Sequence, residues 1–371
     1  GSRGLGDVYK RQLLNNGDLS KTEIVWFYPA SMTQNRFNKF KAEWENTFAT
    51  LFGAPISNII AASESVAPYY YHKAKKGATS TVVSVDIGGG TTDVLIVDKG
   101  EPKYLTSFRF AANTIFGDGY SYDSDSNGFV NKYKDIITNQ LETNNLRGLK
   151  AVLKSVLDKR VSTDVIAFLF SLASNKEIKK EKVEINFAKM LADDIRGKYV
   201  VILFYVAIVY HIAKLMKAKG FDMPRHMTFS GNGSKVLNIL STNDATLVRL
   251  TKIIFEEIYA QSYSIDGLDI IRPANSKEST CKGGIILTPF QSQDYGEIKD
   301  MKTILIGTDN EKFADVHMTY NDVTEADLDS VVDVIKEYIE FTFKLDKKFS
   351  FYDNFDVDRS IMNKVKDLCY R

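Results

Sequence analysis

The sequence predicts an α/β fold built from two lobes. Its 371 residues are enough for two hydrophobic cores. Short β-rich runs between residues 82 and 110 are joined by tight turns, and a strand pattern at 226–231 leads through a glycine turn into a helix pattern. Strands that are interspersed with helices in this way are typical of mixed α/β domains.

Residues 13–80 are predicted to form the remainder of a first lobe. Its expected elements are strands at 22–30 and 57–64 and helices at 37–53 and 65–76. Residues 1–12, GSRGLGDVYKRQ, have neither the apolar centre nor the cleavage site of a secretory signal. We interpret them as a non-native scar and exclude them from the fold prediction.

Residues 81–290 are predicted to form a second lobe. Strands at 82–86, 92–97 and 103–110 form a meander, with Asp98-Lys99-Gly100 as a hairpin turn. Helical patterns at about 118–193 predict an inserted subdomain. The elements that follow are helices at 194–219, 234–241 and 244–261, strands at 226–231 and 267–271, and a segment at 273–287. Residues 291–371 are expected to form a mixed α/β or helical C-terminal extension.

Composition excludes several classes of function. The 48 basic side chains nearly cancel the 47 acidic ones, so net charge gives no reason to expect nucleic acid as a partner. Cys281 and Cys369 lie far apart, which fits a reducing compartment, and we expect a cytoplasmic protein. The longest apolar run, 199–213, is shorter than the roughly 20 residues of a membrane span, so we predict a buried helix and no membrane partner.

The stretch DIGGGTTDVLIV, which begins at Asp86, has more glycine than a hairpin needs. Glycine lets φ become positive and lets a ligand approach the backbone, at a cost of roughly 0.5–1 kcal/mol each. A tight hairpin uses at most two such positions, whereas Gly88, Gly89 and Gly90 are consecutive. Successive amides of this kind can surround an anion such as phosphate. A glycine-rich hairpin without a ligand is the alternative.

Polar side chains flank these glycines on both sides. Thr91 and Thr92 add hydroxyl donors directly after the last glycine. Asp86 and Asp93 add carboxylates, and either could hold the water shell of Mg²⁺, which keeps several waters and uses few protein ligands. The stretch therefore combines backbone amides and hydroxyls, which can bind phosphate oxygens, with carboxylates, which can hold hydrated Mg²⁺.

A second glycine turn follows the strand at 226–231. Its residues are Ser230, Gly231, Asn232, Gly233 and Ser234, and a helix pattern begins at the last of them. Backbone amides and a helix N-terminus would then lie at the end of the strand, where they favour an anion. A helix cap is the simpler reading of the turn alone. Two glycine turns, each at a strand end, suggest one ligand that is held from two sides.

The glycine motifs resemble those of a known superfamily. DIGGGTTDVLIV is similar to the second phosphate hairpin of the actin-like ATPase superfamily, which groups acetate and sugar kinases, seventy-kilodalton heat-shock chaperones and actin. FSGNGSK resembles its adenosine motif, and SESVAPYYYH resembles its connecting helix, with Glu64 at the position of a chaperone glutamate. IVWFYPASMTQNRFNKF and SKESTCKGGIIL resemble the preceding strand and helix and the closing helix with packed glycines. The resemblance covers roughly residues 22–290 and is strongest to the chaperones and bacterial actins.

This resemblance implies a ribonuclease-H-like α/β fold that holds ATP or ADP with Mg²⁺ between two lobes. The implied phosphate ligands are the amides of Gly88, Gly89 and Gly90 and the hydroxyl of Thr91. Asp86 would orient Mg²⁺ through water, and Glu64 would act near the metal or the attacking water.

The adenosine would lie along the second turn. Gly231, Gly233 and Ser234 would line it, and Lys235 would pack its stem against the base. Asn232 replaces a glycine of the family's turn. Because asparagine tolerates the left-handed conformation, the turn is expected to survive.

The family's first phosphate loop has no counterpart in a credible position. Its only candidate, Gly4 to Asp7, lies in the predicted scar and has no strand before it. We therefore expect an N-terminally truncated fragment with an incomplete first lobe; a degenerate member of the superfamily is the alternative. Phosphoryl transfer depends on groups on both sides of the phosphate, so we expect ATP hydrolysis of the full-length parent rather than of this chain.

The sequence leads to three functional hypotheses. The first is the ATP-binding module of a chaperone-like or actin-like ATPase, which couples its nucleotide to a conformational change and acts on a protein client. The second is a filament or scaffold protein of bacterial actin type, whose self-association is controlled by nucleotide. The third is a small-molecule kinase, against which the form GGGTTD argues because it looks more like the chaperones and actins.

Overall fold

The computed structural model describes residues 17–369 with internal gaps. The residues that it leaves undescribed within this range are 30, 31, 33, 77–80, 119–123, 242–243, 265–266, 273–275 and 288–323. The predicted scar at 1–12 and the candidate first loop at Gly4–Asp7 lie outside the described residues, as does the first part of the C-terminal extension.

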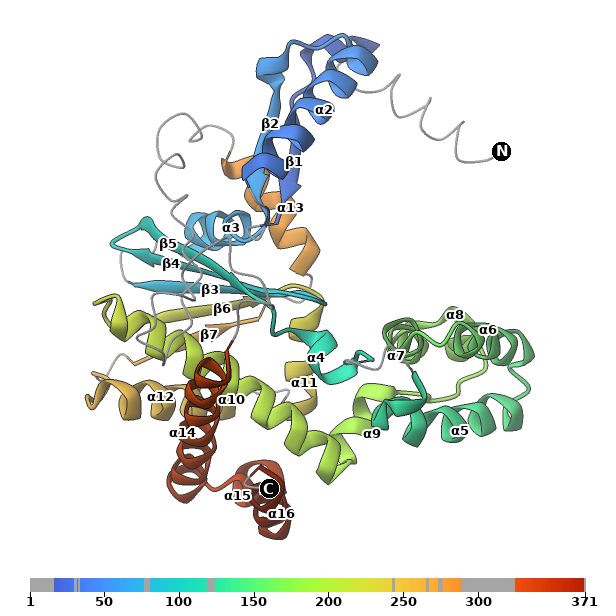
Figure 1. Cartoon of the computed structure of the whole chain (residues 1–371). Helices are drawn as coiled ribbons and strands as arrows, with labels where there is room; N and C mark the ends of the chain where they lie inside the picture. The colour runs from blue at the N-terminus through green and yellow to red at the C-terminus, as the bar shows by residue number, and fades with distance from the viewer. Residues whose placement is uncertain are drawn as a thin grey trace.

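A five-stranded mixed sheet forms the centre of the second lobe (Figure 1). Strands β3 (Val82–Ile87), β4 (Thr92–Asp98) and β5 (Glu101–Phe108) form an antiparallel meander. Strands β6 (His226–Ser230) and β7 (Asp269–Ile271) run parallel to β3, which gives the order β5-β4-β3-β6-β7. This order, with these directions, is that of a ribonuclease-H-like sheet. The predicted fold class is therefore confirmed.

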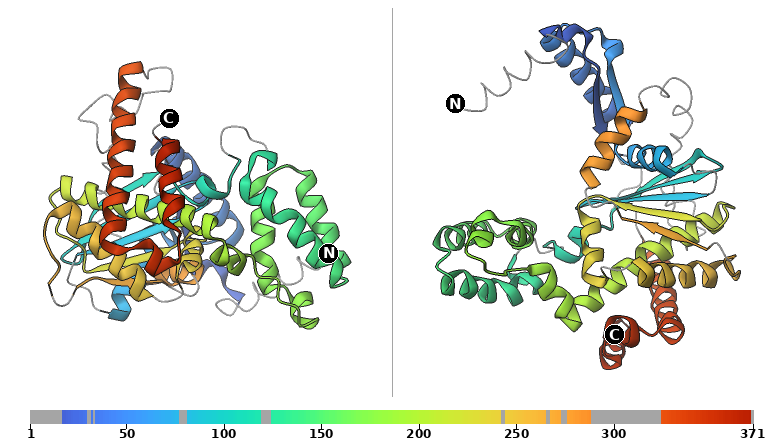
Figure 2. Two further views of the ribbon diagram at one scale, coloured as in Figure 1. Left: turned by 90° about the horizontal axis from the view of Figure 1, so that it is seen from below. Right: turned by 180° about the vertical axis from the view of Figure 1, so that it is seen from behind.

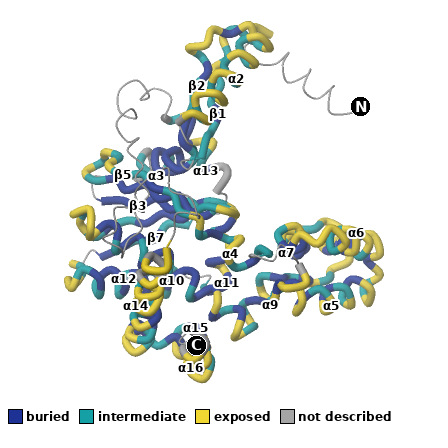
Figure 3. Tube along the Cα trace, viewed as in Figure 1, coloured by how far each residue is buried: buried dark blue, intermediate teal, exposed yellow. Residues whose placement is uncertain are grey.

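The two faces of the sheet are covered by different helices. Apolar side chains such as Val85 pack in the main core with α10 (Ile195–Ala218) and α12 (Asp244–Tyr259). Leu95 faces the other way and packs in a smaller cluster with α3 (Ala67–Lys76). Figure 3 shows the sheet and α10 as the most buried parts of the chain. Because strand side chains alternate between faces, this arrangement also fixes which face each polar residue of β3 and β4 occupies.

The described part of the first lobe is a β-α-β unit. Strand β1 (Ile24–Tyr28) pairs in parallel with β2 (Ile59–Ser63), and α2 (Gln34–Phe52) connects them. Aromatic side chains hold α2 on the strands, as in the stacking of Trp26 on Trp44 with ring centroids 6.1 Å apart. Two parallel strands joined by a helix match the strand–helix–strand pattern predicted from the sequence.

Helix α13 (Ser276–Leu287) packs closely against α3 and the first lobe. A Cβ at Gly283 would lie 1.7 Å from the carbonyl oxygen of Ala67, and one at Gly284 would lie 2.4 Å from the ring of Phe27. A larger residue at Gly283 would require the backbone at Ala67 to shift, and one at Gly284 would require the ring of Phe27 to move. The packed glycines of a closing helix, which the resemblance implied, are therefore present.

The predicted insertion is a separate bundle of helices on one side of the molecule (Figure 1). A short helix, α4 (Ala112–Phe116), leads into it from β5. Its helices are α5 (Gly128–Thr143), α6 (Arg147–Asp158), α7 (Ser162–Ser171), α8 (Lys176–Lys180) and α9 (Phe187–Asp193). The chain then returns to the sheet through α10.

Helix α10 is long and apolar enough to cross a membrane by length and composition alone. Its most apolar window has a mean hydropathy of 2.0, but 72% of that window is buried inside the structure. It packs against α12 and contacts α9, α11 (Leu237–Leu240) and the C-terminal helix α14 (Glu325–Phe349). In this structure α10 is therefore the core helix that the sequence predicted.

The described part of the C-terminal extension is helical. It consists of α14 (Glu325–Phe349), α15 (Phe351–Phe355) and α16 (Arg359–Cys369), and α14 projects beyond the body of the lobe (Figure 2). The hydroxyl of Tyr338 donates to the carbonyl of Leu203 at 2.6 Å, which joins α14 to α10. The extension is thus a third layer outside α10 and α12.

Burial of His211 predicts that the fold loses stability in acid. The half-buried ring packs edge-on against Phe108, and this burial lowers its pKa from 6.5 to about 4. His211 is therefore neutral in the folded chain, whereas the unfolded chain binds a proton below pH 6.5. The free energy of unfolding should fall as the pH drops from about 6.5 towards 4, by about 3 kcal/mol.

Chemical denaturation at pH 7 and pH 4.5 measures this loss. The variant His211→Leu should lose less stability between the two pH values than the unmodified chain does. Equal losses in both chains would contradict the assignment of this acid sensitivity to His211.

Candidate functional site

Two glycine turns meet at the carboxyl ends of β3 and β6. The first turn, 88–91, joins β3 to β4 and is closed by a hydrogen bond from the amide of Gly88 to the carbonyl of Thr91 at 2.9 Å. The second turn, 231–233, follows β6 and leads into a 3₁₀ turn (Gly233–Val236) and α11. Since β3 and β6 are parallel neighbours, their ends lie side by side. Ligands of open α/β sheets bind where such strand ends meet.

The glycines of the second turn are required by its contact with the first. Gly231 has a φ of +82°, and a Cβ there would lie 2.3 Å from the carbonyl oxygen of Ile87. A Cβ at Gly233 would lie 2.4 Å from the carbonyl oxygen of Gly88. Asn232 is exposed, with φ −68° and ψ −30°. We expected Asn232 to adopt the left-handed conformation, and this was wrong: Asn232 is right-handed, and Gly231 is the residue in the left-handed conformation.

The glycines of the first turn have a different explanation. None of Gly88, Gly89 and Gly90 has a φ between +20° and +160°, so positive φ is not the reason for these residues, contrary to one part of the sequence argument. A Cβ at Gly90 would have no heavy atom within 4 Å, and Gly89 and Gly90 are exposed. The fold itself therefore does not require glycine at position 90. Close approach of a ligand to the backbone would account for glycine at this position.

Hydrogen bonds to α4 fix the first turn from behind. The carbonyls of Gly88 and Gly89 accept from the amides of Ala112 at 3.2 Å and Asn113 at 2.8 Å. Within the described part of the chain, the amides of Gly89 and Gly90 donate to no backbone carbonyl. The amide of Gly88 is used inside the hairpin, so of the three predicted donors only those of Gly89 and Gly90 are available to a ligand.

The two threonines after the glycines have different environments. Thr92 is fully buried, and its hydroxyl donates to the carbonyl of Phe110 at 2.6 Å. Thr91 is half-buried at the end of the turn itself. Thr92 therefore holds β4 to the segment before α4, and Thr91 is the better placed hydroxyl for a ligand at the turn.

The structure separates the two candidate carboxylates. Asp86 and Asp93 are opposite one another in the β3–β4 register and therefore face the same side of the sheet. Asp93 is buried and accepts hydrogen bonds from Ser65 at 2.8 Å and Ser107 at 2.5 Å. Asp86 is only half-buried and accepts from Ser230 at 3.1 Å. Asp86 is thus the carboxylate that an approaching metal ion could reach, and Asp93 has a structural role.

Glu64 is brought to the same end of the sheet by this network. It lies in the turn between β2 and α3, is half-buried, and its amide donates to the carbonyl of Tyr28 at 3.0 Å. The next residue, Ser65, is hydrogen bonded to Asp93, which faces the same side of the sheet as Asp86. Glu64 therefore lies next in sequence to the residue through which the first lobe contacts the Asp93 carboxylate.

The residues proposed to hold a base lie around the second turn. The hydroxyl of Ser234 donates to the carbonyl of Gly231 at 2.7 Å, so it stabilises the turn. Lys235 is exposed, which leaves its stem able to cover an aromatic ligand. Among the described residues, no cluster of three or more His, Cys, Asp or Glu side chains could hold a metal ion. A magnesium ion at Asp86 would therefore depend on water and on phosphate oxygens for its other ligands.

Asn113 was not identified from the sequence. It lies in the first turn of α4, and its carboxamide oxygen is 3.3 Å from the position that a Cβ on Gly89 would take. The only signal was the polar pair Asn113-Thr114 in an otherwise apolar segment. Its place over the turn depends on the hydrogen bonds from the amides of Ala112 and Asn113 to the carbonyls of Gly88 and Gly89, which sequence spacing does not reveal.

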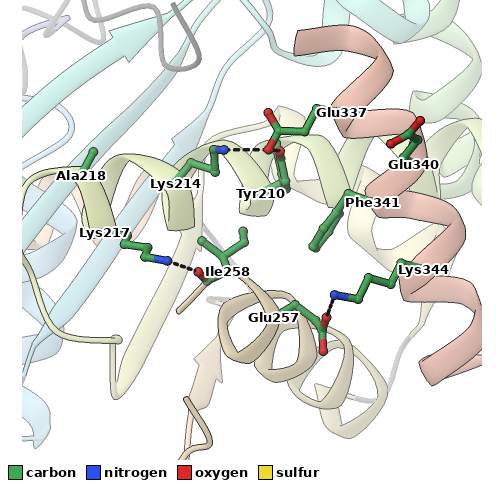
Figure 4. Close-up of a pocket in the computed structure, with 10 residues that line it drawn as sticks. All are labelled: Tyr210, Lys214, Lys217, Ala218, Glu257, Ile258, Glu337, Glu340, Phe341 and Lys344. Atoms are coloured by element: carbon green, nitrogen blue, oxygen red, sulfur yellow. Dashed lines mark hydrogen bonds and ion pairs between the residues drawn. The ribbon is translucent and has the colours of Figure 1, made fainter. Parts of the chain in front are cut away.

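A cavity of about 760 Å³ lies between α10, α12 and α14, and it shares no residue with the glycine turns (Figure 4). Its lining residues are Tyr210, Lys214, Lys217, Ala218, Glu257, Ile258, Glu337, Glu340, Phe341 and Lys344. Two lysine–glutamate pairs connect its walls, at 2.8 Å for Lys214–Glu337 and 2.6 Å for Lys344–Glu257, and Lys217 donates to the carbonyl of Ile258. Because these charges balance, we assign the cavity to the docking of α14.

Comparisons with known proteins give structural likeness only. No family model matches the chain, and no curated protein matches it. The chain is similar to the ethanolamine utilization protein EutJ from Carboxydothermus hydrogenoformans, with 12% identity and a TM-score of 0.33 over 76% of this chain and 70% of that chain. It is also similar to MreB 5 of Spiroplasma citri bound to AMPPNP, with 15% identity and a TM-score of 0.38 over 77% and 73% of the two chains. The site is therefore assigned from its geometry alone.

The contact between the turns predicts that Gly231→Ala destabilises the fold. The added Cβ would clash with the carbonyl of Ile87, and the positive φ adds strain, so we expect a loss of about 3 kcal/mol or failure to fold. Urea denaturation measures the loss. Gly148→Ala is the matched control, because a Cβ at that exposed helix position meets no heavy atom within 4 Å. Similar stability of the two variants would contradict the close contact.

Proposed function

We propose that the chain binds an adenine nucleotide with Mg²⁺ where the two glycine turns meet. One observation carries the proposal: Gly90 is exposed, has no positive φ and has space for a Cβ, so the fold does not explain the glycine. The amides of Gly89 and Gly90 supply donors for phosphate oxygens. The hydroxyl of Thr91 adds a further donor at the same turn.

The two carboxylates of the site, Asp86 and Glu64, have different roles in this proposal. Asp86 holds Mg²⁺ through water, since a half-buried carboxylate beside phosphate oxygens suits an ion that retains most of its hydration shell. Its hydrogen bond from Ser230 orients the carboxylate. In this proposal Glu64, which precedes the Ser65 that contacts Asp93, acts near the metal or the attacking water from the first lobe.

The adenosine lies along the second turn. The absence of side chains at Gly231 and Gly233 keeps that turn flat against the first one, and the stem of Lys235 covers one face of the base. Asn232 and Ser234 border the ribose. The nucleotide then contacts both turns and Glu64, so its binding is coupled to the relative position of the two lobes.

The proposed activity is nucleotide binding with a conformational response. Among the described residues, the donors to phosphate come from the second lobe, and the first lobe contributes a carboxylate. Phosphoryl transfer requires stabilising groups around the whole phosphate. We therefore propose slow or absent turnover for these residues acting alone.

Substitution of Gly90 separates ligand binding from folding. Gly90→Val places a branched side chain where the phosphate approaches, without a clash inside the chain. We expect the affinity for MgATP, measured by isothermal titration calorimetry, to fall at least tenfold while the midpoint of thermal unfolding changes by about 2 °C or less.

Two further chains complete this experiment. Gly148→Val, at an exposed helix position with free space, should leave MgATP affinity unchanged. Asp86→Ala should remove the gain in affinity that Mg²⁺ gives to ATP. If the unmodified chain and Gly90→Val bind MgATP equally well, the turn is not the phosphate site.

A further inference from the structure

The side chain of Asn113 lies over the glycine turn, and neither a hydrogen bond within the described residues nor helix capping explains its presence there. Its side chain is exposed, and its carboxamide oxygen and nitrogen are 3.3 and 3.5 Å from the Cβ position of Gly89. Across the described residues, this carboxamide takes part in no hydrogen bond, although the backbone amide of Asn113 donates to Gly89. The N-cap residue of α4 is Ala111, so Asn113 does not cap the helix.

The position of Asn113 is fixed from both ends of α4. At the N-terminal end, the amides of Ala112 and Asn113 bond to the carbonyls of the glycine turn. At the C-terminal end, the carboxamide nitrogen of Asn127 donates to the carbonyls of Phe116 at 3.1 Å and Gly117 at 2.7 Å. A five-residue helix tied at both ends presents its side chains in a defined place. Such preorganisation lowers the cost of binding a ligand.

We propose that Asn113 is a further ligand-binding residue of the site, whose Nδ2 donates to the phosphate that rests on Gly89. This inference rests on the proposed function. The carboxamide adds an uncharged donor beside the amides of Gly89 and Gly90. It would strengthen phosphate binding without placing a second positive charge next to Mg²⁺. A hydrogen bond to a charged phosphate oxygen is stronger than one between neutral groups.

The proposal predicts an effect that depends on phosphate. Asn113→Ala should weaken MgATP binding about tenfold, as expected for a lost hydrogen bond to a charged group. Asn113→Asp should weaken it further, because a carboxylate would repel the phosphate. Neither change should alter the affinity for adenosine, which has no phosphate. Asn139→Ala, an exposed asparagine on α5, is the matched control and should leave both affinities unchanged.

Titration calorimetry with MgATP and with adenosine distinguishes the outcomes. The proposal is overturned if Asn113→Ala and Asn113→Asp bind MgATP as the unmodified chain does, while Gly90→Val still loses binding; the nucleotide site then stands without Asn113. It is also overturned if adenosine affinity falls in parallel with MgATP affinity, since the residue then acts on the structure of the site. If the unmodified chain binds neither MgATP nor adenosine, the proposed function itself fails, and the inference fails with it.

Discussion

The arrangement of the site depends on the close approach of the second glycine turn to the end of β3. The backbone at Gly231 and Gly233 lies so close to the carbonyls of Ile87 and Gly88 that a Cβ atom at either glycine would clash with them. Parallel pairing of β3 with β6 brings the two turns together, and the missing Cβ atoms let them touch. The same strand pairing places Ser230 opposite Asp86, and the Ser230 hydroxyl donates to that carboxylate at 3.1 Å.

A second set of contacts connects this centre to the rest of the chain. The buried carboxylate of Asp93 accepts from Ser65, in the turn before α3, and from Ser107, on β5. Buried carboxylates are costly unless they are hydrogen bonded, so this arrangement constrains where the first lobe sits. On the other side, α4 joins the first turn to the helical insertion. The glycine turn is thus the place where the first lobe, the sheet and the insertion are linked.

Much of the fold could be predicted from the sequence because local patterns determine it. The short apolar runs of β3 and β4 and the turn at Lys99-Gly100, where both residues have positive φ, are local features. The continuous apolar character of α10 likewise follows from its burial between the sheet and outer helices. The glycine clusters correctly indicated two turns at strand ends, although the reason for each glycine required the contacts between the turns.

The roles of individual side chains could not be predicted because they depend on contacts across the fold. Thr91 and Thr92 are adjacent in sequence, but strand alternation and the carbonyl of Phe110 bury only the second hydroxyl. The residue pattern alone makes Asp86 and Asp93 equivalent, and only the resemblance singles out Asp86; in the structure Ser65, from the first lobe, is bonded to Asp93. Asn113 depends in the same way on the path of the chain after β5.

The most direct test of the account is hydrogen–deuterium exchange of the chain with and without MgATP. If the nucleotide binds where the turns meet, amide exchange should slow in both 87–92 and 230–236, while peptides from α6 and α16 should exchange as before. The amides of Gly89 and Gly90 should show the largest change, because within the described structure no backbone carbonyl accepts from them. Unchanged exchange in both turns at saturating MgATP, or protection confined to the cavity between α10, α12 and α14, would contradict the account.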